Sequence, residues 1–301
     1  MCGLFGFSCY GETPFKDLPV LTNSLAEHSA VRGTDASGIA FVKSGNIQIH
    51  KEAKSAFSMQ FRHPDGIRAL IGHTRHATHG SETRNYNNHP FSGKAGITRF
   101  ALAHNGVLWN THLNLPKTKI ETDSYAAVQL IEREKKLNFA SLRTMAETVS
   151  GSFSFSILDD RDNLWLVKGD SPLSILHFPG KRMFVYASTD EILYKAIVDS
   201  PLFPALKQRQ FEEIPVSQGT ILKISPDGSL ASESFRFRES LRPCWWEMGY
   251  TIDPVIRDAD TEYLDALRTT ALYQGIDPEE IDGLLEMGFS LDEIEEAIYE
   301  V

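Results

Sequence analysis

Short runs of strand-forming residues, some with alternating apolar and polar positions, occur throughout the part of the chain before Phe237. Neighbouring side chains on a strand point to opposite faces, so alternation predicts strands that are buried on one side. Turn residues separate paired runs at Ser44-Gly45-Asn46 and at Pro226-Asp227-Gly228. The predicted strands cover residues 38–43, 48–51, 69–73, 100–104, 152–158, 220–225 and 229–235.

Three stretches have helical character instead. Thr122 is a residue type that caps helix N-termini, and Tyr125, Val128 and Ile131 give the residues behind it an imperfect apolar face. The predicted helices cover residues 122–136, 139–149 and 191–198.

The pattern changes after Phe237, where strand signals stop and acidic helical sequence begins. Asp277-Pro278-Glu279-Glu280 predicts a helix start, because proline fits the first turn and acids favour the positive end of the helix dipole. Gly288 ends this helix, and apolar residues between Leu291 and Ile298 predict a second short one.

We therefore expect two parts, a domain at residues 1–240 and an acidic helical segment at residues 241–301. Residues 284–294 resemble a small helical domain of the ubiquitin-associated type. The alternative is a helical hairpin that packs on the main domain or presents an acidic face to solvent.

Charge is concentrated in the second part. The net charge of the chain is −10, yet fourteen acids and the single base Arg268 follow residue 257, which leaves about +3 for the preceding residues. The main domain shows no basic stripe, so we expect no nucleic-acid partner.

No apolar run is long enough to cross a membrane and no signal peptide is visible at the start, so we expect a cytoplasmic protein without membrane contact. The three cysteines, Cys2, Cys9 and Cys244, are too few and too scattered for a disulfide framework, which favours free thiols in a reducing compartment.

Cys2 directly follows Met1 and is small enough for the initiator methionine to be removed. The mature chain would then begin with an amine and a thiol on one residue, and the amine can act as the general base for the thiol. The alternative is that Cys2 has no catalytic role and is an incidental apolar residue at the start of an edge strand.

Five further segments bear on this choice. They are Arg32-Gly33-Thr34-Asp35-Ala36-Ser37-Gly38, Gly72-His73-Thr74-Arg75-His76-Ala77-Thr78-His79-Gly80, Asn88-His89-Pro90-Phe91, Ala103-His104-Asn105-Gly106 and Glu121-Thr122-Asp123-Ser124. In this order behind an N-terminal CGLFGF, they resemble the class II glutamine amidotransferase domain, the N-terminal-nucleophile hydrolase unit found in glucosamine-6-phosphate synthase.

The resemblance covers about residues 2 to 240 and implies an α+β fold, a four-layer αββα sandwich of two antiparallel sheets, with a short helical appendage behind it. It also implies an enzyme without a cofactor, which hydrolyses the glutamine side-chain amide to glutamate and ammonia.

The resemblance also assigns roles. The oxyanion formed by attack of Cys2 would meet the Asn105 side chain and the Gly106 backbone N–H. Arg75 would bind the substrate α-carboxylate and Asp123 the α-ammonium, with Thr78 lining the pocket.

Arg32 matches an arginine that orders the loop around the nucleophile in this family, and a surface salt bridge is the alternative for it. His89 and His104 are expected to shape the site through hydrogen bonds. At His76 the resemblance breaks, since the family pattern has a tryptophan near the ammonia outlet, and it therefore does not extend to an ammonia channel.

His73, His76 and His79 share a regular spacing, but on a strand His76 would point away from the other two, so we expect no metal site.

About sixty residues follow Phe237, too few for an ammonia-consuming domain, so we expect a free-standing unit that serves a separate synthase subunit. Two alternatives stay open, a stand-alone hydrolase of a γ-glutamyl amide and a non-catalytic protein that senses glutamine.

Overall fold

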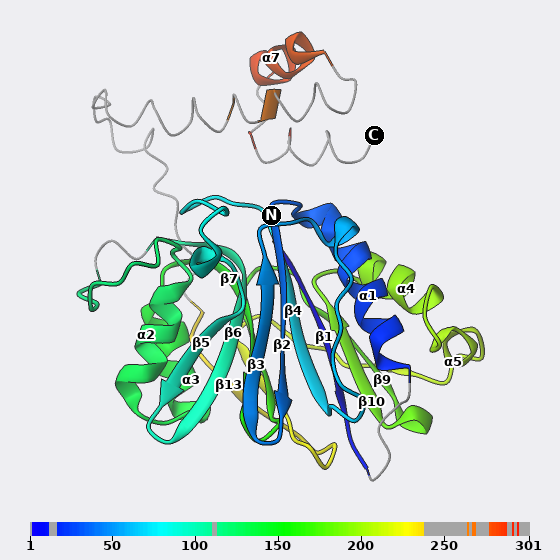
Figure 1. Ribbon diagram of the computed structural model, residues 1–301. Coiled ribbons are helices and arrows are strands. Elements are labelled where there is room, and N and C mark those ends of the chain that lie inside the picture. Colours follow the sequence, from blue (N-terminus) through cyan, green and yellow to red (C-terminus); the bar gives the residue numbers. More distant parts are fainter. Residues whose placement is uncertain are drawn as a thin grey trace. The chain divides into compact units, whose positions relative to one another are not determined.

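Two antiparallel sheets form the inner layers of the main domain, and helices cover their outer faces (Figure 1). The computed structural model describes residues 2–11, 17–109, 113–237, 264, 267–268, 277–287, 291 and 294. The chain divides into two units, Met1–Ser240 and Leu241–Val301. The first unit is the α+β sandwich that the resemblance implied.

The first sheet has seven strands and carries the N-terminal strand at its centre. Its order is β11 (Glu212–Glu213), β9 (Ser174–Phe178), β10 (Met183–Ala187), β1 (Gly3–Cys9), β4 (Ala69–Arg75), β2 (Ala36–Lys43) and β3 (Asn46–Glu52). Because β1 pairs with both β10 and β4, it is not the edge strand considered above.

The second sheet has six strands and lies against the first. Its order is β13 (Leu230–Ser234), β12 (Thr220–Ile224), β8 (Leu164–Lys168), β7 (Gly151–Asp159), β6 (Thr98–Leu108) and β5 (Phe91–Ala95). Strand β6 contacts both β1 and β4 across the layer between the sheets. The ends of β1, β4 and β6 can therefore contribute to one site.

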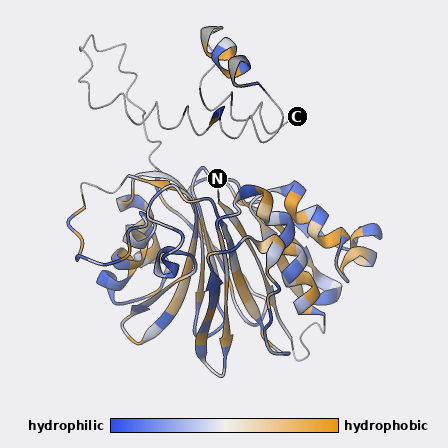
Figure 2. Cartoon of the chain, turned by 45° about the horizontal axis from the view of Figure 1, so that its top comes forward, coloured by the Kyte–Doolittle hydropathy of each residue, from blue (hydrophilic) through white to orange (hydrophobic). Residues whose placement is uncertain are grey.

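Two groups of helices cover the sheets. The helices α1 (Leu18–Ser29), α4 (Asp190–Val198) and α5 (Phe203–Lys207) pack with the seven-stranded sheet, and α2 (Tyr125–Glu134) and α3 (Phe139–Thr148) with the six-stranded one. Both groups show hydrophilic and hydrophobic stripes in Figure 2. Short 3-10 turns lie at η1 (Ala30–Arg32), η2 (Ala56–Ser58), η3 (Asn85–Asn87) and η4 (Pro179–Lys181).

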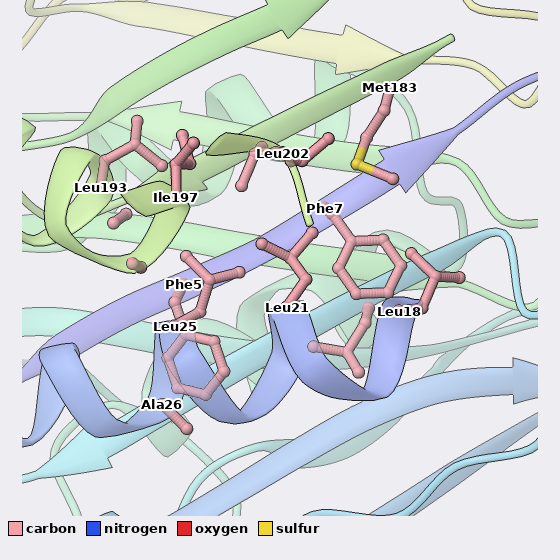
Figure 3. Packing of buried hydrophobic residues seen from close by; sticks show 14 of the residues in the cluster. Phe5, Phe7, Leu18, Leu21, Leu25, Ala26, Met183, Leu193, Ile197 and Leu202 are labelled. Atoms are coloured by element: carbon pink, nitrogen blue, oxygen red, sulfur yellow. The ribbon is translucent and has the colours of Figure 1, made fainter. Parts of the chain in front are cut away.

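Strand β1 is buried on both faces. Phe5 and Phe7 pack against Leu21 and Leu25 of α1, as Figure 3 shows, while Leu4 belongs to the cluster between the sheets. Full burial of such side chains stabilises a fold by about 1.5–3 kcal/mol each. The strand that carries Cys2 at its start is thus held from both sides.

The sequence predicts most strands correctly, with ends that differ by a few residues. One helix boundary is wrong: α2 begins at Tyr125, because Thr122 lies in the preceding turn, where its hydroxyl donates to the Asn87 carbonyl at 2.8 Å. The predicted elements did not include the helices α1 and α5 or the strands β5, β8, β9, β10 and β11.

In the second unit, α7 (Pro278–Glu286) begins at the predicted proline. The described residues of this unit form a small apolar cluster of Leu267, Ile281 and Ile294. The Nη2 of Arg268 lies 2.5 Å from the Asp282 carboxylate. The predicted break at Gly288 and most of the last short helix fall outside the described residues. Among the residues that are described, no helix is both long and apolar enough to span a membrane.

Candidate active site

Cys2 lies directly before β1, at the end where β4 finishes. Its Sγ–H donates to the His76 carbonyl at 3.4 Å, and the Arg32 Nε–H donates to the Cys2 carbonyl at 2.9 Å. Arg32 therefore contacts the backbone of the predicted nucleophile directly.

The loop behind β4 is fixed against the segment that follows Arg32. A Cβ on Gly33 would lie 2.3 Å from the Arg75 carbonyl carbon, so only glycine allows this approach. The Asp35 N–H donates to the Arg75 carbonyl at 3.0 Å, and the Ala77 N–H donates to the Asp35 carboxylate at 2.7 Å. These contacts set the position of the His76 carbonyl that receives the thiol hydrogen.

Arg75 is the largest of the fully buried side chains among the described residues and is 2% exposed. Its guanidinium donates to the Asn88 side chain at 2.7 Å and to the carbonyls of His79 and Gly80 at 2.5 and 2.7 Å. These bonds use three of the five N–H donors of an arginine, so donors are left for a carboxylate.

Asn105 and Gly106 follow each other on β6. Asn105 is fully buried, and neither its amide nitrogen nor its carbonyl oxygen has a hydrogen-bond partner within the described chain. Gly106 has φ +130°, and a Cβ there would lie 2.0 Å from the Ser152 carbonyl oxygen. A buried polar group without a hydrogen-bond partner is costly. Such a group is therefore expected where a bound ligand supplies the missing hydrogen bond.

Asp123 is tied to the same strand beyond Gly106. Its Oδ2 accepts the Leu108 N–H at 2.6 Å, and its Oδ1 accepts the Ser124 hydroxyl at 3.2 Å. The carboxylate is thereby fixed in the turn before α2 and is half-buried.

Electrostatics connect these groups to the thiol. Burial raises the pKa of Cys2, while Arg75 lowers it and Asp123 raises it. Burial likewise lowers the pKa of Arg75, and the Cys2 thiolate and nearby carboxylates oppose this shift. Cys2, Arg75 and Asp123 therefore share one electrostatic environment.

Three buried histidines lie behind this group. The His73 Nε2–H donates to the His104 carbonyl at 2.8 Å, and the His104 ring lies 2.7 Å from the Ser124 hydroxyl. His89 has no hydrogen-bond partner for either ring nitrogen in the ranges described, so its expected role through hydrogen bonds stays a prediction. Its ring instead lies 4.1 Å from that of His73, centroid to centroid.

Burial keeps all three rings neutral. It lowers the pKa of His73 to about 3, that of His89 well below its usual value, and that of His104 as well, although Asp123 partly opposes the last shift.

The remaining predicted residues lie in the loop after β4. Thr78 is exposed, with its hydroxyl 3.3 Å from the His79 ring. His76 and His79 are exposed whereas His73 is buried, so the three rings face different surroundings. The described residues contain no group of three or more histidine, cysteine or acidic side chains that could hold a metal ion.

Several residues that shape the site were not predicted from the sequence. Asn88 and Ser124 stand inside the quoted motifs. The motifs do not reveal that Asn88 accepts a hydrogen bond from Arg75 or that the Ser124 hydroxyl donates to Asp123. Lys51 carries no motif signal. Its ammonium donates to the carbonyls of Asn88 and Pro90, and burial lowers its pKa to about 8.

A cysteine at the start of a central strand, within a two-sheet sandwich, is the arrangement of the N-terminal-nucleophile class of proteins. Residues 1–193 match the family described as glutamine amidotransferases class-II. The chain belongs to this family.

Curated relatives agree with that assignment. The chain is 33% identical over 189 residues to a glutamine–fructose-6-phosphate aminotransferase (isomerizing) of Streptococcus agalactiae serotype III (strain NEM316). It is 35% identical over 191 residues to the enzyme of the same name from Staphylococcus aureus (strain Mu50 / ATCC 700699). Each alignment covers 58% of this chain and 30% of the relative, so the chain spans less than a third of these relatives' length.

Solved structures agree on the fold. A glutamine phosphoribosylpyrophosphate amidotransferase from B. subtilis, complexed with ADP and GMP, matches with a TM-score of 0.60 at 21% identity. An allosteric regulatory enzyme of purine biosynthesis matches with a TM-score of 0.59 at 20% identity. Each match covers 79% of this chain and 50% of the other.

The buried histidines predict a specific loss of stability in acid. An unfolded histidine takes up a proton near pH 6.5, whereas folded His73 does so only near pH 3. Between these values the unfolded state binds more protons than the folded state. As the pH is lowered, the free energy of unfolding therefore decreases by about 1.4 kcal/mol per pH unit for this residue. The pH dependence of the free energy of unfolding is measured by urea unfolding of wild type and His73→Asn at several pH values. The free energy should change less steeply with pH in the variant, and equal steepness would contradict a neutral buried ring.

Proposed function

We propose that this protein hydrolyses the side-chain amide of glutamine, with Cys2 as the nucleophile after removal of Met1. The observation that carries the proposal is the buried Asn105 carboxamide, which has no partner in the described structure and stands beside Gly106 on a strand that contacts β1. Family membership supports the same reaction.

The reaction uses groups of this chain alone. The Cys2 amine takes the thiol proton, and the sulfur attacks the amide carbon. The oxyanion accepts hydrogen bonds from the Asn105 side chain and the Gly106 N–H. Collapse of this intermediate passes the proton to the leaving nitrogen and releases ammonia, leaving a thioester on Cys2. Water then attacks the thioester and yields glutamate and the free thiol.

The two charged ends of glutamine fit two charged groups of the site. We assign the α-carboxylate to Arg75, whose guanidinium is already positioned by Asn88 and the loop carbonyls. We assign the α-ammonium to Asp123, which Leu108 and Ser124 hold in place. We assign Thr78 to the lining of the glutamine site. Arg32 fixes the backbone of the nucleophile by donating to the Cys2 carbonyl.

We further propose that a separate synthase subunit accepts the ammonia. The relatives' names describe transfer of an amino group from glutamine, which supports an acceptor of some kind. At the position of the family's outlet tryptophan this chain has His76, which is exposed, so the proposal does not extend to a sealed ammonia channel.

The nucleophile is tested by ammonia release from glutamine without any acceptor, combined with the intact mass of the purified protein. Wild type should lack Met1 and release ammonia, and Cys2→Ala should release none above background. The matched control is Cys9→Ala, a buried thiol on the same strand that packs toward the helices and should keep most of the activity. Activity that survives in Cys2→Ala would refute the assignment.

The oxyanion site is tested by Asn105→Ala. Loss of one donor to the oxyanion should lower kcat by about 10²–10³-fold while KM changes little, because the donor acts mainly in the transition state. Ser156→Ala, a buried position on the adjacent strand β7, serves as the control and should stay within about twofold. A rise in KM with unchanged kcat would instead make Asn105 a ground-state contact.

A further inference from the structure

A continuous line of polar contacts leads from Asp123 to the strand opposite Gly106. The Ser124 hydroxyl lies 3.2 Å from the Asp123 Oδ1 and 2.7 Å from the His104 Nδ1. The other ring nitrogen, Nε2, lies 3.3 Å from the Ser152 carbonyl oxygen. Ser124 and His104 are 2% and 1% exposed, so bulk water does not complete these bonds.

This line has one hydrogen too few. Its three contacts join two ring nitrogens, a hydroxyl, a carboxylate and a carbonyl, and each contact needs a hydrogen between its atoms. The Ser124 hydroxyl supplies one, and a neutral imidazole supplies one. Burial lowers the pKa of His104, which agrees with the neutral ring. In either tautomer of His104, one of the three contacts is therefore left without its hydrogen.

A substrate ammonium at Asp123 removes this shortage. It donates its own hydrogen to the carboxylate, so the Ser124 hydroxyl is released to donate to the His104 Nδ1. The ring then holds its hydrogen on Nε2, where it donates to the Ser152 carbonyl. No net proton is taken up, because the neutral ring carries one hydrogen both before and after the substrate binds, and only the nitrogen that holds it is fixed by binding.

The far end of the line is the oxyanion site. The Ser152 carbonyl oxygen packs directly against Gly106, 2.0 Å from where a Cβ would stand, and His104 immediately precedes Asn105. We propose that Ser124 and His104 are positioning residues that couple binding of the substrate α-ammonium to the alignment of Asn105 and Gly106. The inference rests on the proposed function, since it assigns the ammonium to Asp123.

The coupling is tested with two substrates, glutamine and glutaramate, which has the same amide and carboxylate but no α-amine. In wild type, kcat should be higher for glutamine. Ser124→Ala should reduce the ratio of the two kcat values by about tenfold, the effect of about one buried hydrogen bond. The control Ser156→Ala should leave the ratio unchanged.

A merely structural role for Ser124 would lower kcat for both substrates by the same factor, and an unchanged or increased ratio would overturn the proposal. If wild type releases ammonia from neither substrate, the proposed function itself fails, and this result is distinct from an unchanged ratio.

A second measurement needs neither turnover nor a variant of Ser124. In Cys2→Ala labelled with ¹⁵N-histidine, saturating glutamine should place the His104 ring in the Nε2–H form, and glutaramate should not; loss of the signals in His104→Gln assigns them. The same ring tautomer with both ligands would overturn the proposal.

Discussion

The hydrogen bond from the His73 ring to the His104 carbonyl joins the two sheets at the candidate active site. His73 lies two residues before Arg75 on β4, and His104 lies directly before Asn105 on β6. One sheet provides Cys2 and Arg75, and the other provides Asn105, Gly106 and the anchor of Asp123. This contact therefore links the strand that carries Arg75 to the strand that carries Asn105.

The chemistry imposes costs that the surrounding fold offsets. Burial is costly for the Asn105 carboxamide, which has no partner among the described residues, for the neutral imidazoles and for the almost fully buried guanidinium of Arg75. Large apolar side chains on both faces of β1 and between the sheets oppose these costs. The strand that positions Cys2 is therefore buried along its whole length, which fixes the place of the thiol at its start.

Much of this arrangement could be predicted from the sequence, and the exceptions have physical causes. Strand β7 alternates clearly, whereas β1 reads GLFGFSC and is buried on both faces, so alternation does not reveal its central place. Helix α1 was missed because Pro19 and polar residues on its inner side, such as Thr22, obscure the apolar face. The motif gave the types of the site residues, but the contacts of Lys51 and Ser124 depend on how distant segments meet.

The central claim is that Cys2, at the mature N-terminus, is the thiol that faces bound glutamine. It is tested most directly with a glutamine analogue that carries an electrophilic diazoketone in place of the amide, followed by peptide mass spectrometry. The account predicts one adduct, on the peptide that begins at Cys2, and protection by excess glutamate. An adduct on Cys9 or Cys244, or on a peptide that still begins with Met1, would contradict it.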